Sequence, residues 1–181
     1  KAIQYAAINR LLQRKVYLDD ATGLPNKNKC EELLSEEETD ADTGVCSFDL
    51  NNLKKINDNM GHTYGDDLIS GFARILKETF EKEAVVGRMG GDEFIVIIRS
   101  DDGRIDYKTF RKKLQHVIDE YNHKESRFKY SVACGYADST EAGDNNGNVD
   151  ARQIYSMADD RMYVHKREIK EKMKQEKSGN E

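Results

Sequence analysis

The strongest constraint on the fold is a pair of apolar runs that flank two glycines and two acids. The first run covers residues 85–90 and ends at Gly90-Gly91, and the second covers residues 94–98. Two strand-like runs around a short glycine-containing turn predict a β-hairpin. The second run is too continuously apolar for an exposed edge, so we expect it inside a sheet. Asp92 and Glu93 then lie in the turn, although the glycine pair alone indicates only a turn.

The remaining pattern alternates helices with single strands. Two further strands are expected, at residues 44–50 and 128–137. Helices are expected at residues 1–17, from a cap at Asn26 or Asn28 to about 35, and at 51–60, 68–80, 107–121 and 150–175, with connections at 19–26, 36–43, 61–65 and 141–149. This order predicts an α/β (α+β) sandwich with a central mixed, mainly antiparallel sheet flanked by helices. We expect a linker or stalk helix at 1–17, one domain at 18–170 and a charged, fraying tail at 171–181.

Composition narrows the class of partner. The formal net charge of the 181 residues is −5, which argues against a nucleic-acid polymer held on a broad basic face. A nucleotide substrate stays open, because a metal ion can bridge carboxylates and phosphates. No stretch approaches the roughly 18 apolar residues of a membrane span, so we expect no direct membrane contact in this segment.

The cysteines indicate the compartment. Cys30, Cys46 and Cys134 are widely spaced and form no C-x-x-C pair, which favours buried thiols over a zinc site or disulfides. We therefore expect a reducing, cytoplasmic compartment. The chain also starts inside a predicted helix, so we expect an upstream sensor domain and a possible membrane anchor in the full-length protein.

Three acids are the first candidates for chemistry. Asp49 lies near the end of predicted strand 44–50, and Asp92 and Glu93 lie in the hairpin turn. Carboxylates beside a core are costly unless they are paired, hydrogen-bonded or bound to a metal. Two or three converging carboxylates suit Mg²⁺ and the phosphates that it carries. A turn acid plus a strand-end helix cap explains the spacing equally well, so both interpretations stay open.

Four blocks of sequence occur in an order known from one protein family. Residues 49–66 match D-x-D-x-F-K-x-x-N-D-x-x-G-H-x-x-G-D at most positions, and residues 90–94 read Gly-Gly-Asp-Glu-Phe. Residues 19–27 resemble D-x-L-T-G-L-x-N-R, and residues 158–166 resemble A-D-x-A-L-Y-x-A-K. Together the blocks resemble the GGDEF family of diguanylate cyclases over roughly residues 18–170. The resemblance implies a nucleotidyl-cyclase-like fold whose hairpin carries the GGDEF motif.

The resemblance also implies a metal site for Mg²⁺ or Mn²⁺. Its ligands would be Asp49, Asp92 and the main-chain carbonyl of Leu50. Glu93 would lie beside the metals as a further ligand or as a catalytic group in proton transfer, together with Asp92.

A GTP site is implied next to the metals. Asn57 and Asp66 would bind guanine, whose N1–H and amino group form a donor pair that one carboxylate can accept and that adenine lacks. The implied phosphate contacts are the N–H groups of Asn52, Leu53 and Lys54 at a helix N-terminus, and the side chains of Lys166 and Lys170. Helix capping by Asp66 and a solvated surface position for each lysine are the alternatives.

The chain departs from the family pattern at several positions. Asn51 stands where the motif often has a second Asp, Lys170 where it often has Arg, and Ile169 where a Gly is usual. Lysine keeps the charge but loses bidentate phosphate geometry. Glu81 and Ala84 occupy the positions of the R-x-x-D product-inhibition motif, so we expect no product-inhibition site there.

The implied activity is the Mg²⁺-dependent condensation of two GTP molecules into cyclic di-GMP and two pyrophosphates across a homodimer. The main alternative is a non-catalytic GTP-binding regulatory GGDEF module. A cyclase with relaxed base choice and a structural dimerisation domain are further alternatives. The N-terminal helix fits either a coupling stalk or a helix that packs on its own domain.

Overall fold

The computed structural model describes residue 4 and residues 12–35, 42–80, 84–100, 107–124, 127–142 and 150–178. Residues 12–17 are helical. The elements that follow are α2 (Lys27–Ser35), β1 (Asp42–Leu50), α3 (Leu53–Met60), α4 (His62–Phe80), β2 (Ala84–Gly90), β3 (Glu93–Ser100), α5 (Tyr107–Lys124), β4 (Val132–Asp138), α6 (Ser139–Ala142) and α7 (Ala151–Ser178). Most of the predicted helix 1–17, and the predicted loops over 36–41 and 143–149, lie outside the described residues.

One sheet of four strands organises the chain, in the order β2-β3-β1-β4. Each described pairing is antiparallel. The predicted helix-flanked, mainly antiparallel sheet is therefore confirmed, and the predicted hairpin is β2-β3. Gly90 and Gly91 have φ angles of 147° and 49°, which L side chains rarely adopt, so both glycines are required by the turn.

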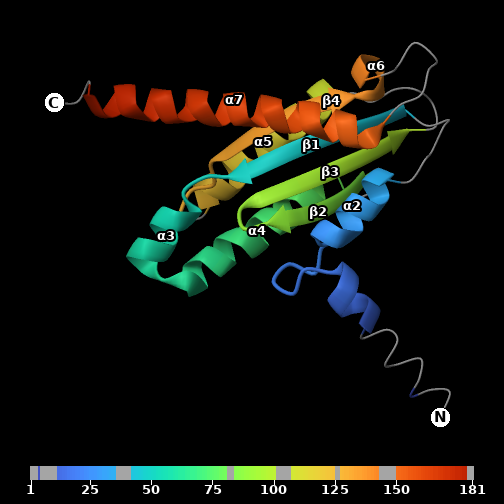
Figure 1. Cartoon of the computed structure of the whole chain (residues 1–181). Helices are drawn as coiled ribbons and strands as arrows, with labels where there is room; N and C mark the ends of the chain where they lie inside the picture. Colours follow the sequence, from blue (N-terminus) through green and yellow to red (C-terminus); the bar gives the residue numbers. More distant parts are fainter. Residues whose placement is uncertain are drawn as a thin grey trace.

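Helices cover both faces of the sheet (Figure 1). Alternate residues of a strand point to opposite faces, and the two sets form two cores. Phe48, Phe94 and Val96 pack with α4 and α5, whereas Val45, Ile95 and Ile97 pack with α2 and α7. The C-terminal part of α7 continues past the strand ends, on the side where α3 lies (Figure 1).

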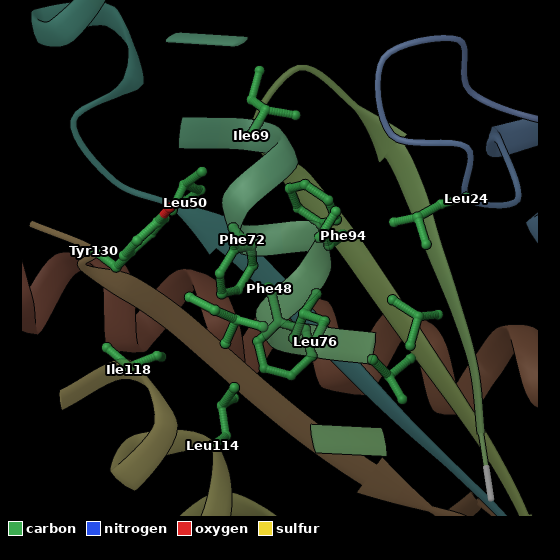
Figure 2. Close-up of a cluster of buried hydrophobic side chains, with 14 of the residues drawn as sticks. Leu24, Phe48, Leu50, Ile69, Phe72, Leu76, Phe94, Leu114, Ile118 and Tyr130 are labelled. Atoms are coloured by element: carbon green, nitrogen blue, oxygen red, sulfur yellow. The ribbon is translucent and has the colours of Figure 1, made fainter. Parts of the chain in front are cut away.

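The core under α4 is the larger of the two. Figure 2 shows Phe72 and Leu76 of α4 directed at Phe48 and Phe94 of the sheet. The rings of Phe72 and Phe94 meet edge to face at 5.1 Å between centroids, which aromatic pairs prefer. Leu24 joins this core at 1% exposure. The loop that precedes α2 is therefore fixed to the domain.

Several predicted boundaries are wrong. The predicted connection 61–65 is reduced to Gly61, because α4 already begins at His62. Asp66 consequently lies inside α4 and does not cap it. Strand β1 begins at Asp42 instead of residue 44, and β4 begins at Val132 instead of residue 128.

Two further points concern the helices. Asn26 caps α2, since its Oδ1 accepts the N–H of Lys29 at 3.1 Å, whereas α6 was not predicted. No helix in the described parts of the chain is long and apolar enough to cross a bilayer.

Candidate active site

The end of β1 meets the hairpin turn. Asp49 pairs with Glu93 in the register of β1 and β3. One residue on, the N–H of Leu50 donates to the carbonyl of Asp92 at 2.8 Å. The sheet therefore fixes three predicted site acids at one end of neighbouring strands, as the sequence led us to expect.

Asp49 is the buried member of this group, at 2% exposure. One carboxylate oxygen, Oδ2, accepts a hydrogen bond from the ammonium of Lys166 on α7. The other oxygen, Oδ1, is buried and has no hydrogen-bond partner. Burial raises the pKa of Asp49 in spite of Lys166, and the nearby Asp92 raises it further. A carboxylate with a free buried oxygen is suited to hold a cation.

Glu93 also faces α7, nearer to the N-terminus of that helix than Asp49 does. Its side chain is exposed, yet partial desolvation and the negative charges of Asp159 and Asp92 raise its pKa. Asp159 is itself held by Ser47 of β1, whose hydroxyl donates to Oδ1 at 2.9 Å. These neighbouring acids make a negative charge at Glu93 less favourable than at an isolated glutamate.

The segment that follows β1 leads from these acids to the N-terminus of α3. Asn51 is buried, and its amide donates to the hydroxyl of Ser131 at 3.2 Å. Asn52 then takes a left-handed conformation, with φ 69°, and its side chain does not cap α3. The N-terminus of α3 is thus uncapped by that side chain, and its first N–H groups are open to an anion.

A cavity of about 470 Å³ lies between these elements and α7. Seven of the predicted site residues line it: Asp49, Asn52, Leu53, Lys54, Asp92, Lys166 and Lys170. The cavity combines the carboxylates of Asp49 and Asp92 with a helix N-terminus and cations from two helices. Such a combination can bind a metal together with a phosphorylated ligand.

Asn57 of α3 and Asp66 of α4 do not line the cavity. Asp66 is exposed on α4. Oδ1 of Asn57 is buried and has no hydrogen-bond partner. Asn57 contacts the residue before Asp66, since a Cβ at Gly65 would lie 2.0 Å from Oδ1. The two residues predicted to bind a base are therefore neighbours.

The hairpin turn is also anchored from outside. Arg88 of β2 donates to both carboxylate oxygens of Asp19, at 3.0 and 3.1 Å, and to the carbonyl of Gly91 at 2.8 Å. Although burial raises the pKa of Asp19, hydrogen bonds from Thr22 and Arg88 leave it below its ordinary value. The loop at Asp19 and the turn that carries Asp92 thus share one guanidinium.

The donor atoms fit a hard divalent cation. Among the described residues, no three His, Cys, Asp or Glu side chains gather closely enough to form a complete metal centre. Mg²⁺, however, is commonly bound through one or two carboxylates together with substrate phosphates and waters. Asp49 and Asp92 provide that pair, and the free Oδ1 of Asp49 provides an unused donor.

Sequence reasoning missed part of the cavity wall. Lys55, Asp58 and Asn59 of α3 and Met173 of α7 also line it. Asp58 belongs to the same motif block as Asn57, and Met173 follows Lys166 by two helical turns. The spacing of residues along one face of a helix could therefore have identified Asp58 and Met173.

The chain is similar to known proteins in sequence and in fold. The family model described as "Diguanylate cyclase, GGDEF domain" matches residues 16–172. The structure of the coiled coil and GGDEF domain of DgcB from Caulobacter crescentus, in complex with c-di-GMP, has a TM-score of 0.71. That match covers 92% of both chains at 22% sequence identity, and establishes a shared fold.

Two relatives have assigned activities of different kinds. The cyclic di-GMP phosphodiesterase PdeR of Escherichia coli is 40% identical over 82 residues, which are 44% of this chain and 12% of PdeR. The diguanylate cyclase DgcS of Shewanella oneidensis is 26% identical over 170 residues, which are 91% of this chain and 53% of DgcS. The chain spans about half of DgcS and a much smaller part of PdeR.

Proposed function

Because the chain belongs to the family of diguanylate cyclase GGDEF domains, we propose that it condenses two GTP molecules into cyclic di-GMP. The 3′-hydroxyl oxygen of each GTP attacks the α-phosphorus of the other. A phosphodiester bond forms, the bond from the α-phosphorus to the oxygen bridging the β-phosphate breaks, and pyrophosphate and the hydroxyl proton are released. Two such transfers close the ring.

The observation that carries this proposal is the surroundings of Asp49. A buried carboxylate with one unpartnered oxygen lies beside Asp92, in a cavity that α7 supplies with lysines. A purely structural acid would have both oxygens satisfied. We infer that Asp49, Asp92 and the carbonyl of Leu50 hold Mg²⁺ or Mn²⁺, with Glu93 beside them.

The metal would neutralise charge on the phosphoryl oxygens and lower the pKa of the attacking hydroxyl. The residues of this chain would position the nucleotide. The N–H groups of Asn52, Leu53 and Lys54 would face the phosphates from the α3 N-terminus. Lys166 would exchange its contact with Asp49 for a phosphate, and Lys170 would approach the same group from the next turn of α7.

Guanine would lie where α3 meets α4, at the neighbouring residues Asn57 and Asp66. The exposed carboxylate of Asp66 can accept from N1–H and from the amino group of guanine, and adenine offers no such pair. Asn57 is only half-buried, so its side chain would face the base from the orientation that it already has beside α4. GTP should therefore be preferred over ATP.

The reaction requires two copies of the chain. The cavity of each copy would hold one GTP. We infer that two subunits face each other as a homodimer, so turnover depends on protein concentration.

The similarity to PdeR favours one second candidate, because a related segment occurs within a phosphodiesterase. In that case the domain binds GTP and regulates another domain without cyclising the nucleotide. The intact Asp92, Glu93, Asn57 and Asp66 support the cyclase instead.

Incubation with GTP and Mg²⁺ at high protein concentration, followed by chromatography of the nucleotides, separates the two candidates. The cyclase forms cyclic di-GMP, and Asp92→Ala abolishes the product whereas Asp160→Ala, an exposed acid on α7, does not. GTP binding without product would favour the regulatory module. Failure to bind GTP at all would contradict both.

A further inference from the structure

A glycine inside α4 is in an unexpected place. Gly65 lies in the first half of α4 at a negative φ, where any L residue fits. Alanine stabilises a helix interior more than glycine does. Backbone conformation therefore gives no reason for a glycine, and the reason must lie in what the position contacts.

The contact is the side-chain amide of Asn57. A Cβ at position 65 would lie 2.0 Å from Oδ1 of Asn57 and 2.9 Å from its Cγ. It would also lie 3.1 Å from Cδ1 of Leu53, a distance that a small shift relieves. The approach is this close because Gly61 alone joins α3 to α4, with its N–H bonded to the carbonyl of Asn57 at 3.0 Å.

The same amide is unusual in a second respect. Oδ1 of Asn57 is buried and unpartnered, which is costly for a polar atom. The rest of the side chain is only half-buried, so the amide has room to turn outward and reach water. The space left by Gly65 is what permits the observed orientation.

We propose that Gly65 is a positioning residue for nucleotide specificity, acting through Asn57. By omitting a Cβ it keeps the Asn57 amide against α4, beside Asp66, so that both face one base. This inference rests on the proposed GTP site. It names a determinant of base selection that makes no contact with the base itself.

A methyl group at position 65 would displace the end of a half-buried side chain and leave the backbone in place. Gly65→Ala should therefore fold normally and lose base recognition. Gly71→Ala is the matched control, because its Cβ would lie 2.0 Å from the hydroxyl of Tyr130, also a side-chain end. Tyr130 belongs to the core and not to the site, so nucleotide affinity should be unchanged.

The test is equilibrium binding of GTP and ATP analogues with a methylene bridge between the α- and β-phosphates, which cannot react. Gly65→Ala should lower affinity for the GTP analogue by about tenfold or more, the order expected when a hydrogen-bonding contact is lost. Affinity for the ATP analogue should change little. In an Asn57→Ala background, Gly65→Ala should have no further effect.

Additive losses in the double variant, or equal losses for both analogues, would overturn the proposal in favour of a general disturbance of α3. The side-chain amide resonance of Asn57 gives an independent readout without nucleotide. It should shift in Gly65→Ala and not in Gly71→Ala, and an unchanged resonance would also overturn the proposal. A wild-type chain that binds neither analogue would instead contradict the proposed function, while the resonance still decides whether Gly65 positions Asn57.

Discussion

The two faces of β1 differ in kind, although their residues alternate along one strand. Phe48 and Leu50 point into the apolar core under α4 at 1% and 0% exposure. Asp49, between them, points to α7 and has Lys166 as its partner. On the first face apolar side chains pack against the core. On the second face Oδ1 of Asp49 is buried without a hydrogen-bond partner. Stability can thus come from one face of a strand while chemistry is built on the other.

The face of the sheet that α4 covers is called the α4 face. Removing an aromatic ring from it should have the largest effect on stability. Phe48→Ala deletes a side chain that touches Phe72 and Phe80, with ring centroids 6.3 Å from each. We expect a loss of about 3–5 kcal/mol in the free energy of unfolding, measured by urea denaturation. Val85→Ala, on the more exposed β2 surface, should stay within about 0.5 kcal/mol. A loss for Phe48→Ala as small as that control would remove the distinction between the faces.

Substitution of Asp49 should lower activity without lowering stability. Asp49 lies on the face of the sheet that α7 covers, called the α7 face. Asp49→Asn removes a carboxylate whose charged form is disfavoured by burial, and Lys166 is exposed enough to reach water. Cyclase activity should fall by about 10²–10³-fold, as when a preorganised electrostatic group is lost, with no loss of unfolding free energy. Destabilisation comparable to that of Phe48→Ala would show that Asp49 is structural.

Substitution of Arg88 tests whether its contacts hold the hairpin turn, and with it Asp92, in position. Arg88→Met removes hydrogen bonds to Asp19 and to the carbonyl of Gly91, so it should cost about 1.5–3 kcal/mol and lower turnover through Asp92. Arg74→Met, an exposed arginine on α4, is the control. Unchanged kinetics in Arg88→Met would mean that the strands alone hold the turn.

The smallest effect is a pH dependence specific to the α7 face. The folded-state pKa values of Asp49 and Glu93 lie above their ordinary values of 3.8 and 4.5. Above those values these two groups hold more protons in the folded state than in the unfolded state, so their contribution to the free energy of unfolding should fall as pH rises. In metal-free protein the fall should be shallower for Asp49→Asn than for wild type. Parallel curves from acid to neutral pH would contradict the raised pKa of Asp49.

Sequence predicted the parts of this molecule whose signal is local. The hairpin followed from Gly90-Gly91 between apolar runs. The acids were singled out by the motif blocks, since their places at strand ends left their role open. The start of α4 was missed because glycine is read as a helix breaker, whereas Gly65 lies in the helix and accommodates Asn57. The pairing of Lys166 with Asp49 was also missed, because it depends on how α7 crosses the sheet.

The most direct test is a crystal structure with Mg²⁺ and the methylene-bridged GTP analogue. The account predicts a metal between Asp49 and Asp92, phosphates at the N-terminus of α3, and the ammonium of Lys166 moved from Asp49 to a phosphate. Nucleotide bound elsewhere, with Lys166 still on Asp49, would contradict the assignment of the α7 face as the catalytic site.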